Sequence, residues 1–186
     1  RLLLRLLRDK PDKIIAVSEN IKNTLSEICG GNTKNIKLLV NAVDTDKFRR
    51  DSAAREHFRE RLGVADDEFL IGFVGRLSKV KGADIAVKAV KELKAGCDKS
   101  VKLLIVGNGK EAGRLKALAA GCEEDVIFAG FCAEPEKIIN AFDTAIVPSR
   151  NEALGLAVLE AMACGVPVVG SSAKGIKEII TNGKDG

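Results

Sequence analysis

Residues 148–170 read PSRNEALGLAVLEAMACGVPVVG. An apolar run ending at Val147 precedes them and predicts a strand, and the apolar residues of 155–163 predict a short helix that Gly165 ends. Glu152 and Glu160 bracket the turn that opens this helix. Backbone N–H groups at a helix start hold phosphate, and carboxylates accept hydrogen bonds from sugar hydroxyls. The stretch therefore predicts a strand–loop–helix unit with a site for a polar, phosphate-bearing ligand.

The same alternation of strand and helix runs through the chain from Glu68 onward. Apolar runs predict strands, and helical patterns fill the gaps between them; the strands are expected at 69–75, 101–106, 126–129, 144–147 and 166–170, and the helices at 82–95, 110–120, 134–142 and 155–163. Strands that are apolar throughout and alternate with helices favour a parallel sheet covered on both faces. The fold class is therefore α/β with a Rossmann-like parallel sheet, whose ligands bind beyond the carboxyl ends of the strands.

The first 63 residues carry a less regular pattern. Residues 13–18, KIIAVS, predict a strand, and Ser18 is expected to cap a helix that Gly30 and Gly31 end. A second buried strand is expected at 36–40, and a charged helix at 52–62 that Gly63 ends. The opening RLLLRLLR, residues 1–8, predicts a basic amphipathic helix that packs on a sheet, with a membrane-surface role as the alternative.

Composition narrows the class of protein. The 186 residues are 46% hydrophobic and 30% charged, as in a globular chain, and the formal net charge is +4. This mild positive charge permits an anionic ligand without indicating nucleic acid, and the absence of Trp and Tyr argues against base-stacking platforms. The five cysteines form no C-x-x-C pair, which indicates reduced thiols in a cytoplasmic protein. The start at Arg1 and the end in TNGKDG favour a piece of a longer protein.

The first candidate site is GRLSKVKG, residues 75–82, directly after the predicted strand at 69–75. Arg76 and Lys81 leave the carboxyl edge of the sheet just before a helix begins near Gly82. An arginine offers a planar fork for phosphate and a lysine a point charge, so two cations beside a helix start suit a diphosphate. The alternative is a solvated basic loop, which is the expectation for Lys79.

The second candidate is the pair of acids, Glu152 and Glu160. Two acids eight residues apart are weak evidence alone, and the alternative is one surface acid and one helix acid. Glu160, however, lies in LAVLEAMA, an otherwise apolar helix. A buried carboxylate is costly unless hydrogen-bond donors reach it, and ligand hydroxyls would be such donors.

Residues 107–113, GNGKEAG, are the third candidate, since they mimic the dinucleotide fingerprint G-x-G-x-x-G/A after a strand. Glu123 and Glu124 follow at a distance that suits a ribose contact. Taken alone, this pattern favours a dehydrogenase. Lys110 and Glu111 argue against it, because they put charge where the turn should approach a pyrophosphate closely.

Two further patterns carry no expected chemistry. DTD at 44–46 resembles an acid pair for a metal but has no third ligand in view, so no metal site is predicted. His57 lies in a highly charged helix and is expected to be an exposed surface residue. It is also the only histidine, so any Ser-His-Asp or Cys-His mechanism would have to use it.

Taken together, the loops resemble those of one family. The chain resembles the carboxyl-terminal half of family 4 glycosyltransferases (glycosyl transferase group 1), which are retaining enzymes of the GT-B fold. The matching segments follow in the family's order: AVSENIK, LLVNAVDTDKF, GFVGRLSKVKG, LLIVGNG, VIFAGF and PSRNEALGLAVLEAMACGVPVV. The resemblance covers nearly the whole chain, and its last segment, with E-x7-E, is highly specific. Because GNG is a normal feature of the family, most of the support for a dehydrogenase disappears.

The resemblance implies a role for each matching residue. Arg76 and Lys81, after Gly75, match the cations that bind the donor's diphosphate and stabilise the leaving nucleotide, and with Glu152, near the donor sugar, they are the expected catalytic residues. Glu160 matches the acid that binds the ribose hydroxyls. The remaining donor-binding positions are a loop beside the base and a turn that holds sugar and phosphate: Phe131 and Cys132, and Ala153, Leu154, Gly155 and Leu156.

The sequence also departs from the family pattern. Val40 and Ala42 replace a proline and a glycine, Ala153 and Leu154 stand in place of Gly-Phe, and Lys174 precedes Gly175 where the family has Gly-Gly. The second and third changes lie close to the donor sugar and put its identity in doubt. The expected domains are a remnant of the acceptor domain and interdomain segment at 1–44, and a truncated nucleotide-sugar-binding domain at 45–186.

The resulting expectation is a donor domain that binds a UDP, GDP or ADP sugar without a metal or other cofactor. A longer parent would transfer the sugar to a sugar, lipid-linked or polysaccharide acceptor in the cytoplasm, with possible peripheral membrane association and no nucleic-acid partner. Half a cleft cannot position an acceptor, so this chain alone should not turn over well. The alternatives are a non-catalytic sugar-nucleotide-binding module and a related GT-B enzyme, such as an epimerase or a phosphorylase; R-x4-K together with E-x7-E argues against the latter two.

Overall fold

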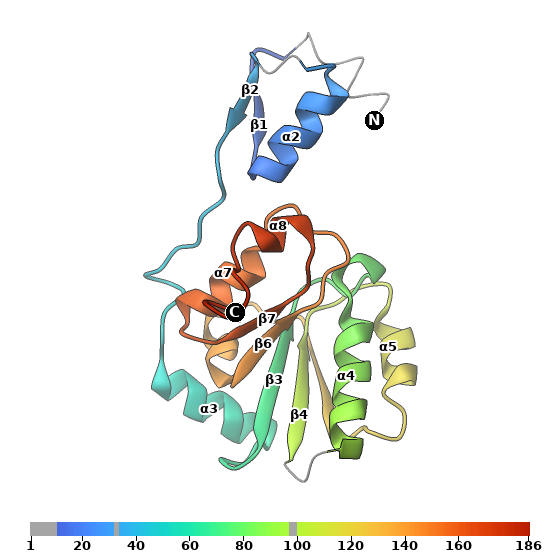
Figure 1. The fold of residues 1–186 in the computed structure, drawn as a ribbon. Helices are drawn as coiled ribbons and strands as arrows, with labels where there is room; N and C mark the ends of the chain where they lie inside the picture. Colours follow the sequence, from blue (N-terminus) through green and yellow to red (C-terminus); the bar gives the residue numbers. More distant parts are fainter. Residues whose placement is uncertain (1–10, 32–33, 97–99) are drawn as a thin grey trace.

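The computed structural model describes residues 11–31, 34–96 and 100–186. Within these ranges the chain forms a two-stranded and a five-stranded sheet, both parallel (Figure 1). The five-stranded sheet has the order β5-β4-β3-β6-β7, with strands β3 (Phe69–Val74), β4 (Val101–Val106), β5 (Val126–Gly130), β6 (Thr144–Val147) and β7 (Val168–Gly170). The α/β fold with a parallel sheet predicted from the strand–helix alternation is confirmed.

Helices follow the strands in nearly the predicted places. They are α3 (Ser52–Leu62), α4 (Ala83–Gly96), α5 (Ala112–Leu118), α6 (Pro135–Ile138), α7 (Leu156–Ala163) and α8 (Lys174–Lys177), with 3-10 turns η1 (Lys79–Lys81) and η2 (Ile139–Ala141). The single helix predicted at 134–142 is thus divided into α6 and η2. As predicted, Gly63 ends α3, with a φ of 64° that a glycine adopts without strain.

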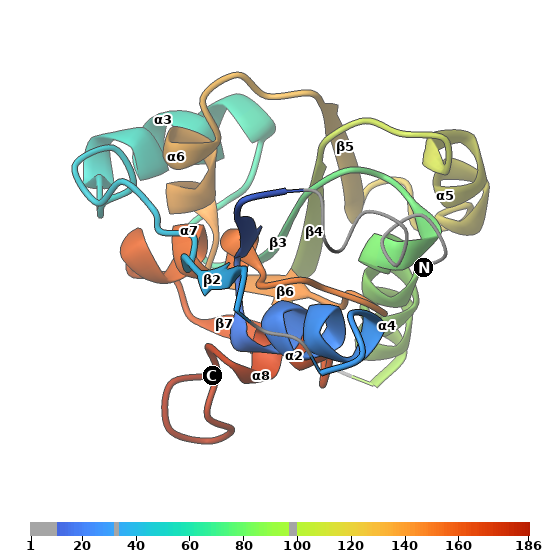
Figure 2. The ribbon, with the colours of Figure 1, turned by 90° about the horizontal axis from the view of Figure 1, so that it is seen from above.

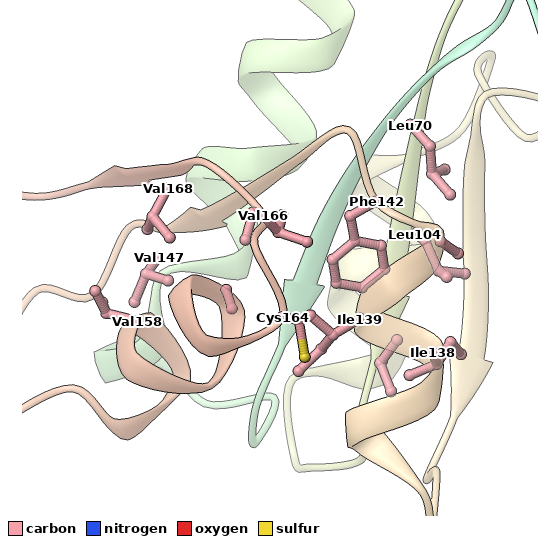
Figure 3. Packing of buried hydrophobic residues seen from close by; sticks show 14 of the residues in the cluster. Leu70, Leu104, Ile138, Ile139, Phe142, Val147, Val158, Cys164, Val166 and Val168 are labelled. Carbon is pink, nitrogen blue, oxygen red and sulfur yellow. The ribbon is translucent and has the colours of Figure 1, made fainter. Parts of the chain in front are cut away.

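The helices cover the large sheet in two layers (Figure 2). Side chains of α4 and α5 pack on one face around Phe73, Leu103 and Ile105. The other face packs against α3, η2 and α7, in a cluster that includes Leu70, Leu104 and Phe142 (Figure 3). Burial on both faces explains why the strands are apolar throughout rather than alternating.

The smaller sheet pairs β1 (Ile14–Ala16) with β2 (Ile36–Leu38), and α2 (Glu19–Ile28) lies between them in the chain. Ser18 caps α2 as predicted, because its side chain accepts the Ile21 N–H. The buried strand predicted at 36–40 is wrong in length and in burial: it ends at Leu38, and Leu39 and Val40 are 63% and 51% exposed. The physical reason is that two strands with one helix cover only part of the surface of β2.

The start of α2 contacts the larger unit. The Ser18 hydroxyl donates to the Ala153 carbonyl at 2.6 Å, and the Glu178 carboxylate accepts the backbone N–H groups of Glu19 and Asn20 at 2.9 and 2.7 Å. An acid at a helix start satisfies free N–H groups and complements the helix dipole. These contacts join the segment before residue 40 to the loop after β6 and to the end of α8.

A partly buried ion-pair network fastens α3 to the amino ends of β3 and β6. Asp143 accepts hydrogen bonds from Arg55 at 2.6 Å, from Arg59 at 3.0 Å and from the Leu70 N–H at 2.7 Å. Arg59 is 5% exposed and also donates to the carbonyls of Ala65 and Glu68. The helix predicted as merely charged therefore places one of its arginines inside the protein.

Some of the sequence features discussed above lie in residues that the structure does not describe. The basic stretch 1–8 and Cys97 fall outside the described residues. Among residues 11–31, 34–96 and 100–186, no helix combines the length and apolar character that crossing a membrane requires.

Candidate functional site

The site begins where the order of the strands reverses. The chain passes from β3 outward to β4 and β5, then returns to β6 on the other side of β3. The loops after β3 and β6 consequently leave neighbouring strands in opposite directions, and ligands of open parallel sheets bind at such switch points. These two loops carry Arg76 and Lys81, and Glu152.

Lys81 and Glu152 form an ion pair across the two loops. The Lys81 ammonium donates to Glu152 Oε2 at 2.6 Å, and the buried Ser149 hydroxyl donates to the same oxygen at 3.1 Å. The Glu152 side chain is 13% exposed and that of Lys81 is 31% exposed. An ammonium has three N–H donors, so Lys81 retains two for an anion after pairing with Glu152.

The loop after β6 packs closely against the backbone at the start of α8. The Gly175 N–H donates to the Glu152 carbonyl, and a Cβ on Gly175 would lie 2.6 Å from the Ala153 carbonyl. Leu154 is 5% exposed, whereas Ala153 and Leu156 are exposed. Gly155, with a φ of 105°, precedes α7 and has no side chain to cap it. The start of α7 is therefore a rigid turn whose N–H groups have no side-chain cap.

A cavity of about 380 Å³ lies at the carboxyl ends of β3 and β4. Residues from β3, β4, α6, α7 and the loops after β3, β4 and β5 line it: Val74, Gly75, Arg76, Val106, Gly107, Asn108, Phe131, Cys132, Pro135 and Glu160. The predicted phosphate cation Arg76, the predicted ribose acid Glu160 and the predicted base loop thus share one cavity. Lys81 and Glu152 do not line it; they form the adjacent ion pair.

The pKa of the Glu160 carboxyl is shifted by its surroundings. Burial raises its pKa above the ordinary value, while the positive charges of Lys47 and Lys81 act in the opposite direction. A partly buried carboxylate with cations nearby is poised to accept hydrogen bonds from hydroxyl groups.

The glycines of the GNG turn have a packing role. A Cβ on Gly107 would lie 2.0 Å from the Gly75 carbonyl oxygen, and one on Gly109 would lie 2.2 Å from the Leu77 carbonyl oxygen. The Leu77 N–H also donates to the Asn108 carbonyl. The turn therefore needs glycine because it lies directly against the loop that carries Arg76, which explains the pattern without a dinucleotide.

The two remaining sequence patterns stay apart from the site. His57 is exposed on α3, as predicted, with its ring edge-to-face with Phe58. The Asp44 carboxylate accepts the backbone N–H groups of Asp46 and Lys47, which makes 44–46 a local turn.

Sequence reasoning missed the residues that join the loops to one another. Arg150 binds Asp84 in two parallel hydrogen bonds, and Glu178 reaches the start of α2. A charged residue directly after a predicted strand was the available signal at Arg150, but nothing in its spacing identifies a partner 66 residues away.

Fold and site together define an open parallel α/β domain with cations and acids gathered at its switch point. The chain belongs to the glycosyl transferases group 1, because the model of that family matches residues 54–186.

Individual relatives agree with this family. The chain is 35% identical to D-inositol 3-phosphate glycosyltransferase of Acidothermus cellulolyticus, over 94% of this chain and 43% of that protein. It is 33% identical to the GDP-mannose-dependent alpha-(1-6)-phosphatidylinositol monomannoside mannosyltransferase of Mycolicibacterium smegmatis, over 100% of this chain and 51% of that protein. The chain thus spans about half the length of these relatives.

A solved structure gives the same architecture. The crystal structure of HepE from Anabaena, in complex with UDP and glucose, superposes with a TM-score of 0.89 at 28% identity, covering 98% of this chain and 50% of HepE.

Proposed function

We propose that this chain is the carboxyl-terminal, donor-binding half of a family 4 retaining glycosyltransferase. It would bind a nucleoside diphosphate sugar at 45–186, and residues 1–44 would be the remnant of the acceptor domain and its connection. The observation that carries the proposal is the shared cavity, which joins Arg76, Glu160 and the loop at 131–132 beside the Lys81–Glu152 pair. HepE, the structural relative above, was crystallised with UDP and glucose.

Each group then has a physical task. Arg76 and Lys81 bind the diphosphate, and the N–H groups from Ala153 to Leu156 add partial positive charge at the start of α7. Glu160 accepts hydrogen bonds from the ribose hydroxyls, and Phe131 and Cys132 flank the base. Glu152 lies near the donor sugar and holds Lys81 through the 2.6 Å contact.

The same groups favour bond cleavage. Breaking the bond between the sugar and the diphosphate develops negative charge on the leaving group and positive charge on the sugar ring. Preorganised cations and helix-start amides stabilise the leaving group as its charge develops, so no metal is required. By resemblance, the full enzyme retains the anomeric configuration and builds a polysaccharide or glycolipid at the cytoplasmic side of the membrane.

Calorimetric titration with UDP, GDP, ADP and their sugar conjugates tests the donor site and identifies the base. Arg76→Ala and Lys81→Ala should each weaken diphosphate binding roughly tenfold or more, since a hydrogen bond to a charged group is worth about 1.5–3 kcal/mol. Lys79→Ala is the matched control, because it removes an exposed cation from the same loop. Unchanged affinity in both site variants would show that the phosphate assignment is wrong.

The role of Glu160 has a separate test. Glu160→Ala should weaken binding of the ribonucleotide, while a 2′,3′-dideoxynucleotide should bind the variant and the original protein equally. If the ribonucleotide does not discriminate between the two proteins either, Glu160 does not bind the ribose.

A further inference from the structure

Arg150 lies in the loop after β6 and hydrogen-bonds both η1 and the first turn of α4. Its guanidinium donates to Asp84 Oδ1 and Oδ2, both at 2.8 Å, and to the Lys79 carbonyl at 2.7 Å. Its backbone N–H donates to the Val80 carbonyl at 2.7 Å. One residue therefore binds two consecutive carbonyls of the 3-10 turn that ends at Lys81.

The partner of Arg150 is itself fixed. Asp84 lies in the first turn of α4 and is 7% exposed. The hydrogen bonds from Arg150 hold the pKa of the Asp84 carboxyl below its ordinary value, although burial acts the other way. Bidentate arginine–carboxylate pairs restrain geometry as well as adding attraction. The Arg150 side chain, which is 46% exposed, thus links the amino end of α4 to η1 through three hydrogen bonds.

The backbone packs equally closely at this point. Gly82 follows η1 with a φ of 72°, and a Cβ there would lie 2.1 Å from the Pro148 carbonyl oxygen. On the far side of the turn, Lys81 reaches Glu152. The segments 79–84 and 148–152 are therefore joined through backbone, guanidinium and ammonium contacts, and only the last involves a proposed donor-binding side chain.

We infer that Arg150 is a positioning residue for the diphosphate site: by bridging the carbonyls of η1 and Asp84, it holds Lys81 where the ammonium can meet the phosphates. The inference rests on the proposed function and goes beyond it, because the Arg150 guanidinium is directed at η1 and α4 rather than at the ligand. Small displacements of a charged group weaken its interaction steeply, so the loss of Arg150 should act on phosphate recognition specifically.

The experiment compares nucleotides with nucleosides. UDP, GDP and ADP are titrated beside uridine, guanosine and adenosine into the original protein, Arg150→Ala, Arg150→Lys and Asp84→Asn. Arg150→Ala should weaken the bound nucleoside diphosphate roughly tenfold and leave its nucleoside within about twofold. Arg150→Lys should recover only part of the loss, because an ammonium cannot bind both carboxylate oxygens and a carbonyl in one plane.

Arg114→Ala is the matched control. The Arg114 guanidinium lies 3.9 Å from the same Asp84 carboxylate, but its closest pairing is with Glu111 in the loop after β4. The Arg114→Ala variant loses one positive charge near Asp84 but keeps the contacts between Arg150 and η1. Its affinity for the nucleoside diphosphate should therefore stay within about twofold of that of the original protein. If Arg114→Ala and Arg150→Ala weaken binding equally, the effect is one of net charge and the inference is wrong.

Coupling provides the second measurement. If Arg150 acts through Asp84, the double variant Arg150→Ala/Asp84→Asn should bind no more weakly than Arg150→Ala alone. Equal loss of nucleoside and nucleotide affinity in Arg150→Ala, or unchanged affinity for both, would overturn the inference while the proposed function stands on Arg76→Ala and Lys81→Ala. Failure of the original protein to bind any of the three nucleotides would overturn both.

Discussion

Replacing Asp143 tests whether the partly buried ion-pair network between α3 and the large sheet stabilises the fold as strongly as its geometry indicates. The carboxylate accepts from Arg55 on one oxygen, and from Arg59 and the Leu70 N–H on the other. In Asp143→Asn one oxygen becomes an NH2 group, which cannot accept. The amide will face its oxygen toward Arg59 and Leu70, since Arg59 is 5% exposed whereas the Arg55 side chain is 37% exposed and keeps its hydrogen bond to the Phe142 carbonyl.

The magnitude follows from what each variant removes. Asp143→Asn loses one charge-assisted hydrogen bond and the charge itself, worth about 2 kcal/mol. Asp143→Ala also deprives Arg59 and the Leu70 N–H of an acceptor. Breaking a buried pair costs about 3–5 kcal/mol, and we expect the lower end, about 3 kcal/mol, because Arg59 keeps the carbonyls of Ala65 and Glu68.

Urea unfolding followed by circular dichroism measures these losses, with Glu56→Gln on the exposed face of α3 as the control that should change stability by less than about 0.5 kcal/mol. At a size of 186 residues, 3 kcal/mol corresponds to a fall in Tm of roughly 6–12 °C. If Asp143→Ala is as stable as the control, the network is not a determinant of the fold.

The pH dependence gives a further check on Asp143. Burial raises the pKa of this carboxyl, but the Leu70 N–H and the two arginines more than offset it, so the pKa lies below its ordinary value of 3.8. The stabilisation by the ionised form is then complete above that value and is lost as the pH falls through the lower folded pKa. The difference between the original protein and Asp143→Asn should therefore be constant near neutrality and narrow in acid; a constant difference throughout would contradict this cause.

Three other predictions concern the site and its surroundings. Gly82→Ala should lower the unfolding free energy by about 1–3 kcal/mol, because its Cβ would meet a carbonyl oxygen at 2.1 Å at a φ of 72°; an unchanged urea midpoint would contradict the packing. Burial raises the pKa of Cys164 to about 11, so in iodoacetamide labelling at neutral pH, read by mass spectrometry, it should react far more slowly than Cys132, and equal rates would contradict its burial. Burial also raises the pKa of Glu160 above 4.5, so the ionised carboxylate destabilises the unliganded fold as the pH rises past that value. Glu160→Gln should therefore raise the unfolding midpoint in urea at neutral pH but not in acid, and it should weaken nucleotide binding. A lower unfolding midpoint at neutral pH would contradict the direction of this pKa shift.

Much of the fold could be predicted from local patterns in the sequence. Apolar runs mark strands reliably in a sheet buried on both faces. Ser18 begins its helix and Gly63 ends its helix through contacts within a few residues. The prediction of a buried strand at 36–40 was wrong because an apolar run does not show how many other elements will cover it. Leu39 and Val40 have the composition of a buried strand but not its surroundings.

The candidate site was predictable only as separate loops. Arg76, Glu160, Phe131 and Cys132 come from three parts of the chain, and their meeting in one cavity depends on the order of the strands. Long-range partners gave no signal in the sequence. Arg59 looks like any surface arginine of a charged helix until Asp143, 84 residues later, is placed beside it.

The ion pair between Lys81 and Glu152 joins residues 71 positions apart, across the junction of β3 and β6. The proposed donor site therefore requires that β6 has paired with β3, since neither loop alone supplies both members of the ion pair. A ligand that binds only the completed junction raises the free energy of unfolding, by about 2.7 kcal/mol at a concentration one hundred times its Kd. The proposed donor nucleotide would thus stabilise the folded chain as well as occupy its site, and the apparent stability of the protein should rise with nucleotide concentration.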